Sequence, residues 1–316
     1  MASTSATMQS YNDLNVLGQV IQVGKGRRTP FFSAIGGLGG VMRAPAQQFA
    51  MSAVYSLDDA SQPGISENTS LSAVTAKFYA KTQEYNVCEI AKYGFVSSNL
   101  NEANRSQLSN TNAVYSSDAP QVSEFDRAAA NAMQQLVADW EFVMLQGTRL
   151  FRDAVTTDVN AGGITDSNIG AESTVDASSG ALSKSLIDSL VEEMAGNGAP
   201  LDNPAIVVPP AYVNQLNDIY GFAEQSRSVG GVNLVQIILP ILGQTSLIWT
   251  NQAPANTLIV ADLAHCKPVV LPHAGGEDIL MHEYSDGGSA RKGYIEGMIS
   301  IDFGSKYYHG FIENLA

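Results

Sequence analysis

A single long amphipathic helix is the feature that most constrains what this chain can fold into. Over residues 118–147, apolar side chains recur at steps of three and four, as on one face of a helix: Val122, Phe125, Ala129, Met133, Leu136, Trp140 and Met144. Asp118 suits the N-cap, Pro120 the first turn, and Gly147 the left-handed position beyond the last turn. Such a helix is about 40 Å long, longer than most small domains are wide. It fits a core helix of any α/β protein, or a rod that spans a whole subunit.

The segment before this helix contains a predicted β-hairpin with little to pack on. Residues 45–55 have a strand-like pattern, and a polar stretch with a turn at Pro63-Gly64 follows. Residues 75–94 then alternate for nearly twenty positions. Both faces of this ribbon carry polar residues, and an isolated two-stranded ribbon is only marginally stable in water. We therefore expect the hairpin to lie on another copy of the chain.

The first 44 residues are rich in Ser, Thr and Gly and show little periodicity. The GGLGG run at residues 36–40 is expected to be too flexible for a regular element. Residues 1–44 are therefore predicted to form an arm without a core of its own.

The chain after the long helix alternates between helix and strand patterns. Helices are expected over residues 182–196 and 211–221, where leucines and other apolar residues precede glycines. Strands are expected at residues 204–210, 246–250, 257–263, 267–272 and 278–285. The last alternating segment, residues 290–315, is predicted to be one long strand or a strand pair.

The charge balance excludes some classes of partner. The chain has 17 Lys and Arg against 31 Asp and Glu, a formal net charge of −14, so it should not bind nucleic acid tightly. Only 15% of the residues are charged, which indicates that partners cover much of the surface. Cys88 and Cys266 are too few and too far apart for a zinc site or a disulfide framework. Neither a signal peptide nor a membrane span is predicted.

Motifs that could carry chemistry are incomplete. GKGRR and the glycines after it lack the lysine and Ser/Thr spacing of a phosphate-binding loop. Residues 158–169 begin like a calcium loop, but Gly162 and Ile169 stand where two ligands belong. His265 adjoins Cys266, and neighbours in a strand point to opposite faces, so shared ligation is not expected. The four histidines are interpreted as structural, and no catalytic, cofactor-binding or metal-ligating residue is predicted.

The order of elements resembles the major capsid protein of tailed bacteriophages, which has the Hong Kong 97-like fold. The resemblance covers essentially the whole chain and is most specific in the carboxyl-terminal third, in WTNQAPANTLIVADLAHCKPVVLP and RKGYIEGMISIDFGSKYYHGFIENL, with Glu296 on the closing strand. It implies an α+β fold with five segments: an N-terminal arm (1–44), an E-loop hairpin (45–93), a P-domain (94–180) with the spine helix (118–147), an A-domain (181–275) and closing strands mainly of the P-domain (276–316).

The resemblance also implies a function. Copies of the chain would form pentamers and hexamers of an icosahedral shell, assembled in the host cytoplasm, with portal, scaffold and decoration proteins as further partners. The shell would enclose double-stranded DNA without sequence-specific binding. The residues proposed for intersubunit contact lie in the arm and the hairpin: Arg27, Arg28, Lys77, Phe78, Tyr79, Lys81, Tyr85 and Lys92. Some relatives join subunits by Lys–Asn isopeptide bonds, but the predicted tip, residues 57–73, has no lysine, so non-covalent assembly is expected.

Two alternatives remain at this point. An encapsulin-type compartment would have the same fold and hold a cargo enzyme. An enzyme built on the α/β lobe would need a convergent polar pocket, and no motif indicates one.

Overall fold

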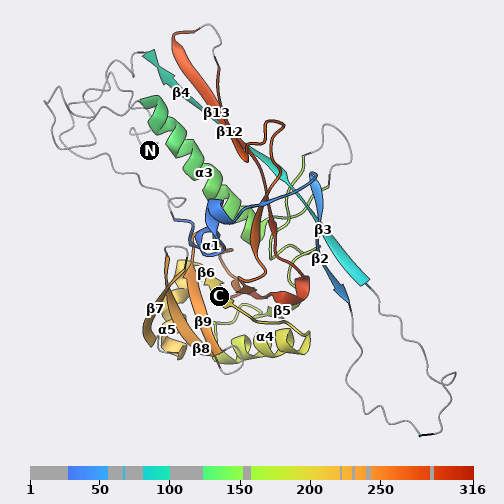
Figure 1. Ribbon diagram of the computed structural model, residues 1–316. Helices are drawn as coiled ribbons and strands as arrows, with labels where there is room; N and C mark the ends of the chain where they lie inside the picture. Colours follow the sequence, from blue (N-terminus) through green and yellow to red (C-terminus); the bar gives the residue numbers. More distant parts are fainter. Residues whose placement is uncertain are drawn as a thin grey trace, which may run out of the picture.

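The computed structural model describes residues 28–55, 67, 81–99, 124–151, 158–220, 223–229, 232–239, 243–284 and 288–316. Figure 1 shows an elongated lobe, in which one long helix runs beside a sheet, and a second lobe at its lower end. The helices are α1 (Pro30–Ala34), α3 (Glu124–Gln146), α4 (Lys184–Gly196) and α5 (Val213–Tyr220), with 3₁₀ helices η4 (Gly37–Gly40), η7 (Pro210–Tyr212) and η8 (Lys306–Tyr308). None of the described helices is long and apolar enough to span a membrane.

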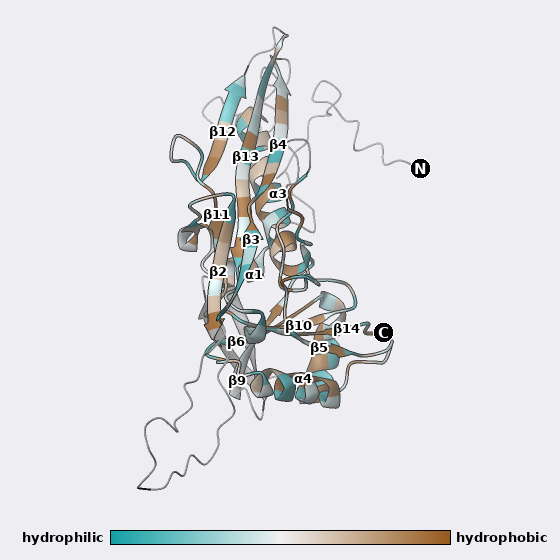
Figure 2. Ribbon diagram, turned by 90° about the vertical axis from the view of Figure 1, so that its right-hand side faces the viewer, coloured by the Kyte–Doolittle hydropathy of each residue, from teal (hydrophilic) through white to brown (hydrophobic). Residues whose placement is uncertain are grey.

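The elongated lobe is organised around β13 (Ala290–Asp302). β4 (Glu89–Ser98) pairs with it antiparallel along one edge. On the other edge β13 pairs with β12 (Ile279–Tyr284) and then with β11 (Lys267–Val270), and β1 (Met42–Arg43) adds to β11 in parallel. Figure 2 shows hydrophobic and hydrophilic residues following one another along β4 and β13, with α3 lying against the sheet.

The long helix forms where the spacing of apolar residues predicts it. α3 covers residues 124–146, and residues 118–123 lie outside the described chain. The predicted apolar face is the buried one, with Phe125, Leu136, Trp140 and Met144 at 0–1% exposure. The Trp140 indole also donates a hydrogen bond of 2.8 Å to the Ser300 carbonyl on β13. This face therefore fixes the helix to the sheet through both packing and one buried polar contact.

The end of α3 corrects the role predicted for Gly147. Gly147 does not have a positive φ angle, so it is not a left-handed cap. A Cβ there would lie 2.5 Å from the Ala161 carbonyl oxygen, which means that the position needs glycine for space. The N–H groups of Gly163, Ile164 and Thr165 donate to the carbonyls of residues 147, 144 and 145, so the following loop satisfies the last carbonyls of the helix.

The second lobe contains a seven-stranded mixed sheet in the order β5-β14-β10-β6-β9-β8-β7. Its strands are β5 (Ser173–Asp176), β6 (Pro204–Val208), β7 (Ala223–Val229), β8 (Val232–Leu239), β9 (Gly243–Trp249), β10 (Leu258–Asp262) and β14 (Gly310–Glu313). β6 and β10 are buried at every residue, as short apolar runs predict for central strands. Sequence analysis predicted β6, β9 and β10 but not β7 and β8.

The closing segment is two strands, one of the two predicted forms. β13 ends at Asp302, η8 follows, and β14 joins the other sheet between β10 and β5. The alternation of the sequence is therefore real, but its two halves pair with different partners. This segment covalently links the two lobes.

The hairpin starts at the pair Gln48 and Val87, and its base is part of the core. β2 (Gln48–Tyr55) pairs with β3 (Lys81–Val87) as a separate two-stranded sheet. One residue later the chain enters β4, so residues 89–94 are extended as predicted but pair with β13 and not with the other strand of the hairpin. Phe49, Met51 and Cys88 are nearly or fully buried in the main core. The expectation that little of the ribbon packs on its own chain is therefore wrong at the base, and residues 56–66 and 68–80 lie outside the described part.

The predicted arm is also partly folded on its own subunit. α1 buries Phe31 and Phe32, and the Phe32 ring lies 4.9 Å from that of Trp140. The glycine run that was expected to be irregular forms η4. Phe31, Phe32, Ile35 and Ala44 therefore belong to the main core, whereas residues 1–27 are outside the described chain.

Candidate assembly surfaces

The two faces of the five-stranded sheet differ sharply in burial. Three odd-numbered residues of β4, Ala91, Phe95 and Ser97, are at most 9% exposed, and Glu89 and Tyr93 on the same side are partly buried. The alternate residues Ile90 and Val96 are 58% and 59% exposed. Along β13 the same alternation continues, because every residue from Gly293 to Ile299 with an odd number is buried and its neighbours are only partly so. We call the face with the even-numbered residues the open face.

The centre of the open face holds an aromatic and charged cluster. The Lys92 ammonium lies 3.8 Å from the centre of the Tyr294 ring and 2.9 Å from a Glu296 carboxylate oxygen. The His282 and Tyr284 rings lie 5.4 Å and 6.1 Å from that of Tyr294. With Gly94 opposite Tyr294, these side chains line a shallow hollow.

The hairpin base is held firmly by one buried amide. The Asn86 side chain donates to the carbonyls of Gly162 and Ile301, at 2.9 and 3.0 Å, and accepts from the N–H groups of Val87 and Gly162. The Ser300 hydroxyl donates to the Val87 carbonyl nearby. Every hydrogen-bonding group of this buried amide is thus satisfied, which joins β3 to β13 and to the loop after α3.

Exposure rises along the hairpin away from this base. Lys81 and Tyr85 are exposed, Tyr85 at 44%, and Figure 1 shows β2 and β3 pointing away from both lobes. The described part of the hairpin therefore exposes side chains to solvent, while Asn86 fixes its base to the core.

A second surface lies at the end of α3, around an acidic hollow. Glu89 and Asp139 line it together with exposed Phe142. The Glu89 carboxylate accepts a bond from the Ala161 N–H, and its burial raises the Glu89 pKa. Asp139 accepts hydrogen bonds from Tyr93 and Gln135. Leu150 and Phe151, also exposed, follow in sequence, so this end of the helix combines apolar surface with negative charge.

The structure places four of the eight predicted contact residues. Lys81 and Tyr85 lie on the hairpin, Lys92 on the open face, and the Arg28 guanidinium lies 5.1 Å from the Trp249 ring. Lys92 and Arg28 thus have partners within the chain, and contact with a neighbouring copy stays a prediction for all four. The other four lie outside the described residues: Arg27, Lys77, Phe78 and Tyr79.

Sequence reasoning missed the apolar residues of the open face. Ile90 and Val96 were not singled out because their alternation was assigned to the hairpin. The signal was present in the pattern, since an alternating strand that buries one face must display the other. Phe142 lacked such a signal because it lies beside the apolar face of α3, and Leu150 lacked one because it lies in the irregular segment after the helix.

Two buried ionisable side chains join distant segments of the chain through hydrogen bonds. The Glu141 carboxylate accepts hydrogen bonds from the Phe32 N–H, at 2.9 Å, and from the Thr250 hydroxyl, and burial raises its pKa to about 7. His309 accepts at Nδ1 from the Asp262 N–H, so its Nε2 is the protonated nitrogen that donates to the Phe303 carbonyl. Burial lowers the His309 pKa to about 4, which keeps this imidazole neutral at pH 7.

Several solved particles share this fold. The capsid protein of a native GTA particle matches with a TM-score of 0.60 and 12% identity over 100% of both chains. The holo-SrpI encapsulin from Synechococcus elongatus PCC 7942 matches with a TM-score of 0.57 and 10% identity over 98% of this chain and 95% of that one. The capsid of the cyanophage P-SCSP1u matches with a TM-score of 0.53 and 11% identity over 95% and 92%. At these identities the likeness is one of fold, and no curated protein matches the sequence.

The family of the chain follows from a match over nearly its whole length. The family model described as SU10 major capsid protein matches residues 3–316. Major capsid proteins are structural proteins that build the shell of a virion, and they are not enzymes. The encapsulin likeness is the weaker alternative, because it rests on fold alone. This chain belongs to the SU10 major capsid protein family.

Proposed function

We propose that copies of this chain associate as pentamers and hexamers into a closed icosahedral shell around a phage genome of double-stranded DNA. One observation carries this proposal: β2 and β3 leave the body as an exposed two-stranded ribbon, while Asn86 fixes their base to the core. A ribbon of two strands is marginally stable alone, so a neighbouring copy supplies the surface that it lies on. Closed assemblies of identical subunits need such repeated contacts.

The elements then take the roles that the Hong Kong 97-like fold gives them. The ribbon β2–β3 is the described part of the E-loop, and α3 is the spine helix of the P-domain, which also contains the five-stranded sheet. The seven-stranded sheet with α4 and α5 forms most of the A-domain. β14 belongs to this sheet, although it lies in residues 276–316, which were predicted to be mainly P-domain. The A-domain is therefore proposed to include chain segments outside residues 181–275.

The proposal includes the contact residues. Phe78, Tyr79 and Tyr85 of the hairpin are proposed to touch the neighbouring subunit. The basic residues proposed to pair with acidic surface there are Arg27, Arg28, Lys77, Lys81 and Lys92. Each exposed ion pair contributes only about 0–1 kcal/mol, so many contacts act together. A net charge of −14 supports enclosing DNA without binding its sequence. Assembly in the host cytoplasm, with portal, scaffold and decoration proteins, belongs to the same proposal.

The ribbon contact can be tested by Tyr85→Asp in the full-length protein. The substitution places a charge on an exposed ribbon residue, so the subunit should keep its melting temperature but yield few closed particles in negative-stain electron microscopy. Glu192→Ala, at an exposed position of α4, is the matched surface control and should assemble normally. Normal particle yield from Tyr85→Asp would contradict the ribbon contact.

Covalent linkage can be tested on the same particles. Non-covalent assembly predicts a single band near 33.5 kDa after boiling in detergent. A ladder of multiples of this mass would overturn the non-covalent part of the proposal while leaving the shell itself intact.

The fold similarity to an encapsulin keeps one alternative, a compartment that holds protein cargo. Particles isolated from the native source distinguish the two. Nuclease-protected DNA of uniform length inside them supports the capsid, whereas a co-purifying enzyme without DNA supports the compartment.

A further inference from the structure

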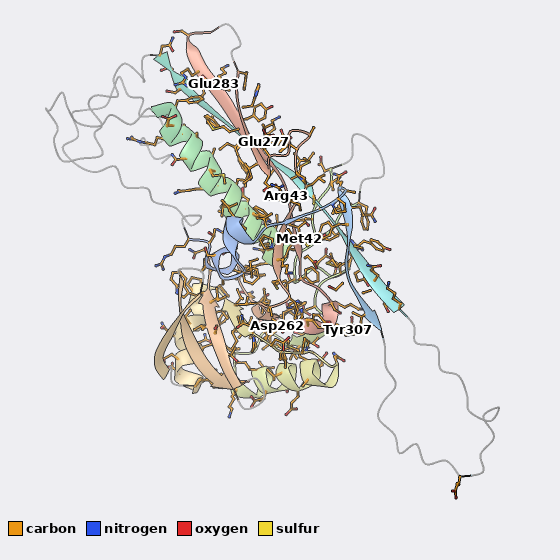
Figure 3. All side chains as sticks on the ribbon, viewed as in Figure 1. Met42, Arg43, Asp262, Glu277, Glu283 and Tyr307 are labelled. Atoms are coloured by element: carbon orange, nitrogen blue, oxygen red, sulfur yellow. The ribbon has the colours of Figure 1, made fainter. Side chains whose placement is uncertain are left out.

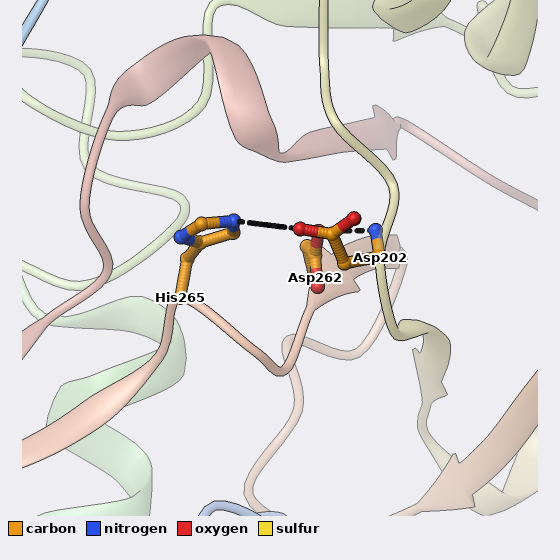
Figure 4. Close-up of side chains that lie close together, drawn as sticks. All are labelled: Asp202, Asp262 and His265. Carbon is orange, nitrogen blue, oxygen red and sulfur yellow. Dashed lines mark hydrogen bonds and ion pairs between the residues drawn. The ribbon is translucent and has the colours of Figure 1, made fainter.

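We propose that Asp202, Asp262 and His265 form a binding site for one divalent transition-metal ion, with zinc as its preferred member. Figure 4 shows the three side chains converging, with the imidazole of His265 directed at the two carboxylates. One oxygen or nitrogen from each residue lies within 4.8 Å of the other two. This site is independent of what the shell encloses.

The spacing of the ligand atoms favours a metal over a direct hydrogen bond. His265 Nε2 lies 3.5 Å from Oδ2 of Asp202 and 3.9 Å from Oδ2 of Asp262. A charge-assisted N–H···O bond is about 2.7–2.9 Å long, so both separations are too long for one. Ligands of a tetrahedral zinc ion with bonds of about 2.0–2.1 Å lie about 3.4 Å from one another. The observed separations need only a small closure around such an ion.

An unpartnered buried atom points into the same place. His265 Nε2 is shielded from solvent and has no hydrogen-bond partner among the described residues. The ring of Tyr308, 4.5 Å from the imidazole, holds it in this orientation. In the Nδ1–H tautomer the lone pair of Nε2 points at the two carboxylates, and a cation between them would turn this contact into an attractive one.

The carboxylate of Asp262 is positioned for one further bond. Its Oδ1 accepts from the N–H groups of Asn203 and Ala264, and its Oδ2 accepts from that of Asp202 alone. Oδ2 therefore keeps one lone pair free on the side of His265. These backbone bonds fix the ligand before any ion arrives, as surrounding hydrogen bonds do in metal sites.

The donor set selects the class of ion. Two carboxylates and one neutral imidazole carry a charge of −2, which a divalent cation neutralises. Calcium and magnesium prefer oxygen ligands alone, whereas an imidazole suits zinc and its transition-metal neighbours. Asp202 is 65% exposed, so water can reach the remaining coordination position.

The position in the fold indicates what the ion does. Asp202 precedes β6, Asp262 ends β10, and His265 lies in the turn that leads to β11. β6 and β10 are neighbours in the seven-stranded sheet, while β11 belongs to the five-stranded sheet. In Figure 3, Asp262 lies where the elongated lobe meets the lower one. The ion would therefore crosslink the ends of β6 and β10 with the turn that leads to the five-stranded sheet.

Calorimetric titration of the chelator-treated full-length protein with Zn²⁺ tests the site. We expect one ion per chain with micromolar or tighter affinity, and a melting temperature about 5 °C higher at saturation. Asp202→Asn and His265→Asn should each weaken binding at least about tenfold. Asp262 is left unchanged, because its loss would break three backbone bonds and could unfold the chain.

His282→Asn is the matched control, because His282 is an exposed histidine on the open face, away from this cluster. It should bind Zn²⁺ like the unaltered protein. The proposal is overturned if the unaltered protein binds no Zn²⁺, or if both cluster variants bind as tightly as it does. Loss of binding in His282→Asn alone would place the ion on the open face and would equally overturn the assignment.

Discussion

The two faces of the five-stranded sheet are built from the same strands but differ in what they contact. On one face Phe95 and Ile295 pack against α3 and stabilise the subunit. On the other face Val96 and Ile90 remain exposed beside the cluster around Tyr294. A one-residue step along β4 thus separates a folding contact from a candidate association contact. The comparison teaches that a single alternating strand can encode both tasks, one on each side of its pleat.

Removing volume from the α3 side should have the largest effect. Trp140→Ala deletes a fully buried ring that packs on Phe32 and bonds to Ser300, so we expect a loss of about 3–5 kcal/mol in the free energy of unfolding. Phe142→Ala, two residues along the same helix but 44% exposed, should cost less than about 1 kcal/mol. Chemical denaturation of both variants measures this difference. Equal losses would mean that the burial contrast does not control subunit stability.

The next effect concerns charge on the buried side of α3. Because the folded-state pKa of Glu141 is raised from 4.5 to about 7, its contribution to stability is fully present below pH 4.5 and is lost as pH rises through 7. Glu141→Gln removes this titration while keeping a group that can accept from Phe32. Relative to the variant, the unaltered protein should therefore lose up to about 3 kcal/mol between pH 4.5 and 8. Unfolding curves at several pH values test this, and parallel pH profiles would contradict it.

The smallest effect on subunit stability is expected on the open face. Val96→Asp should change the free energy of unfolding by less than about 0.5 kcal/mol, because the side chain is already exposed. If this face meets a neighbour, particle yield should nevertheless fall strongly, since a charge would be buried at the contact. Thermal melting and electron microscopy of the same sample separate the two readouts. Full assembly of this variant would remove the open face from the candidate contacts.

Local patterns predicted the parts of the fold that depend on local physics. The apolar face of α3 and the buried runs of β6 and β10 were predicted because their spacing alone determines what they bury. The change of partner at Cys88, from β2 to β13, could not be predicted, because alternation continues through it and only distant strands decide the pairing. The burial of α1 likewise depends on Glu141, 109 residues away.

The candidate sites follow the same rule. Lys81 and Tyr85 could be named from an alternating ribbon, whereas the metal cluster could not. Asp202 and Asp262 are 60 residues apart and meet only because β6 and β10 become neighbours in the sheet. Sequence analysis interpreted His265 as structural because Cys266, its neighbour in sequence, was expected to point to the opposite face.

The direct passage of β3 into β4 has a mechanical consequence. Only Cys88 separates the two strands, so the ribbon and the central sheet form one continuous stretch of backbone. If the ribbon binds a neighbouring subunit as proposed, pressure inside a filled shell would put tension on the ribbon along the axis of β4. The hydrogen bonds between β4 and β13, from Ala290 to Ile299, would then be loaded together in shear rather than opened one after another. The hairpin is thus attached in the direction in which a sheet resists force best.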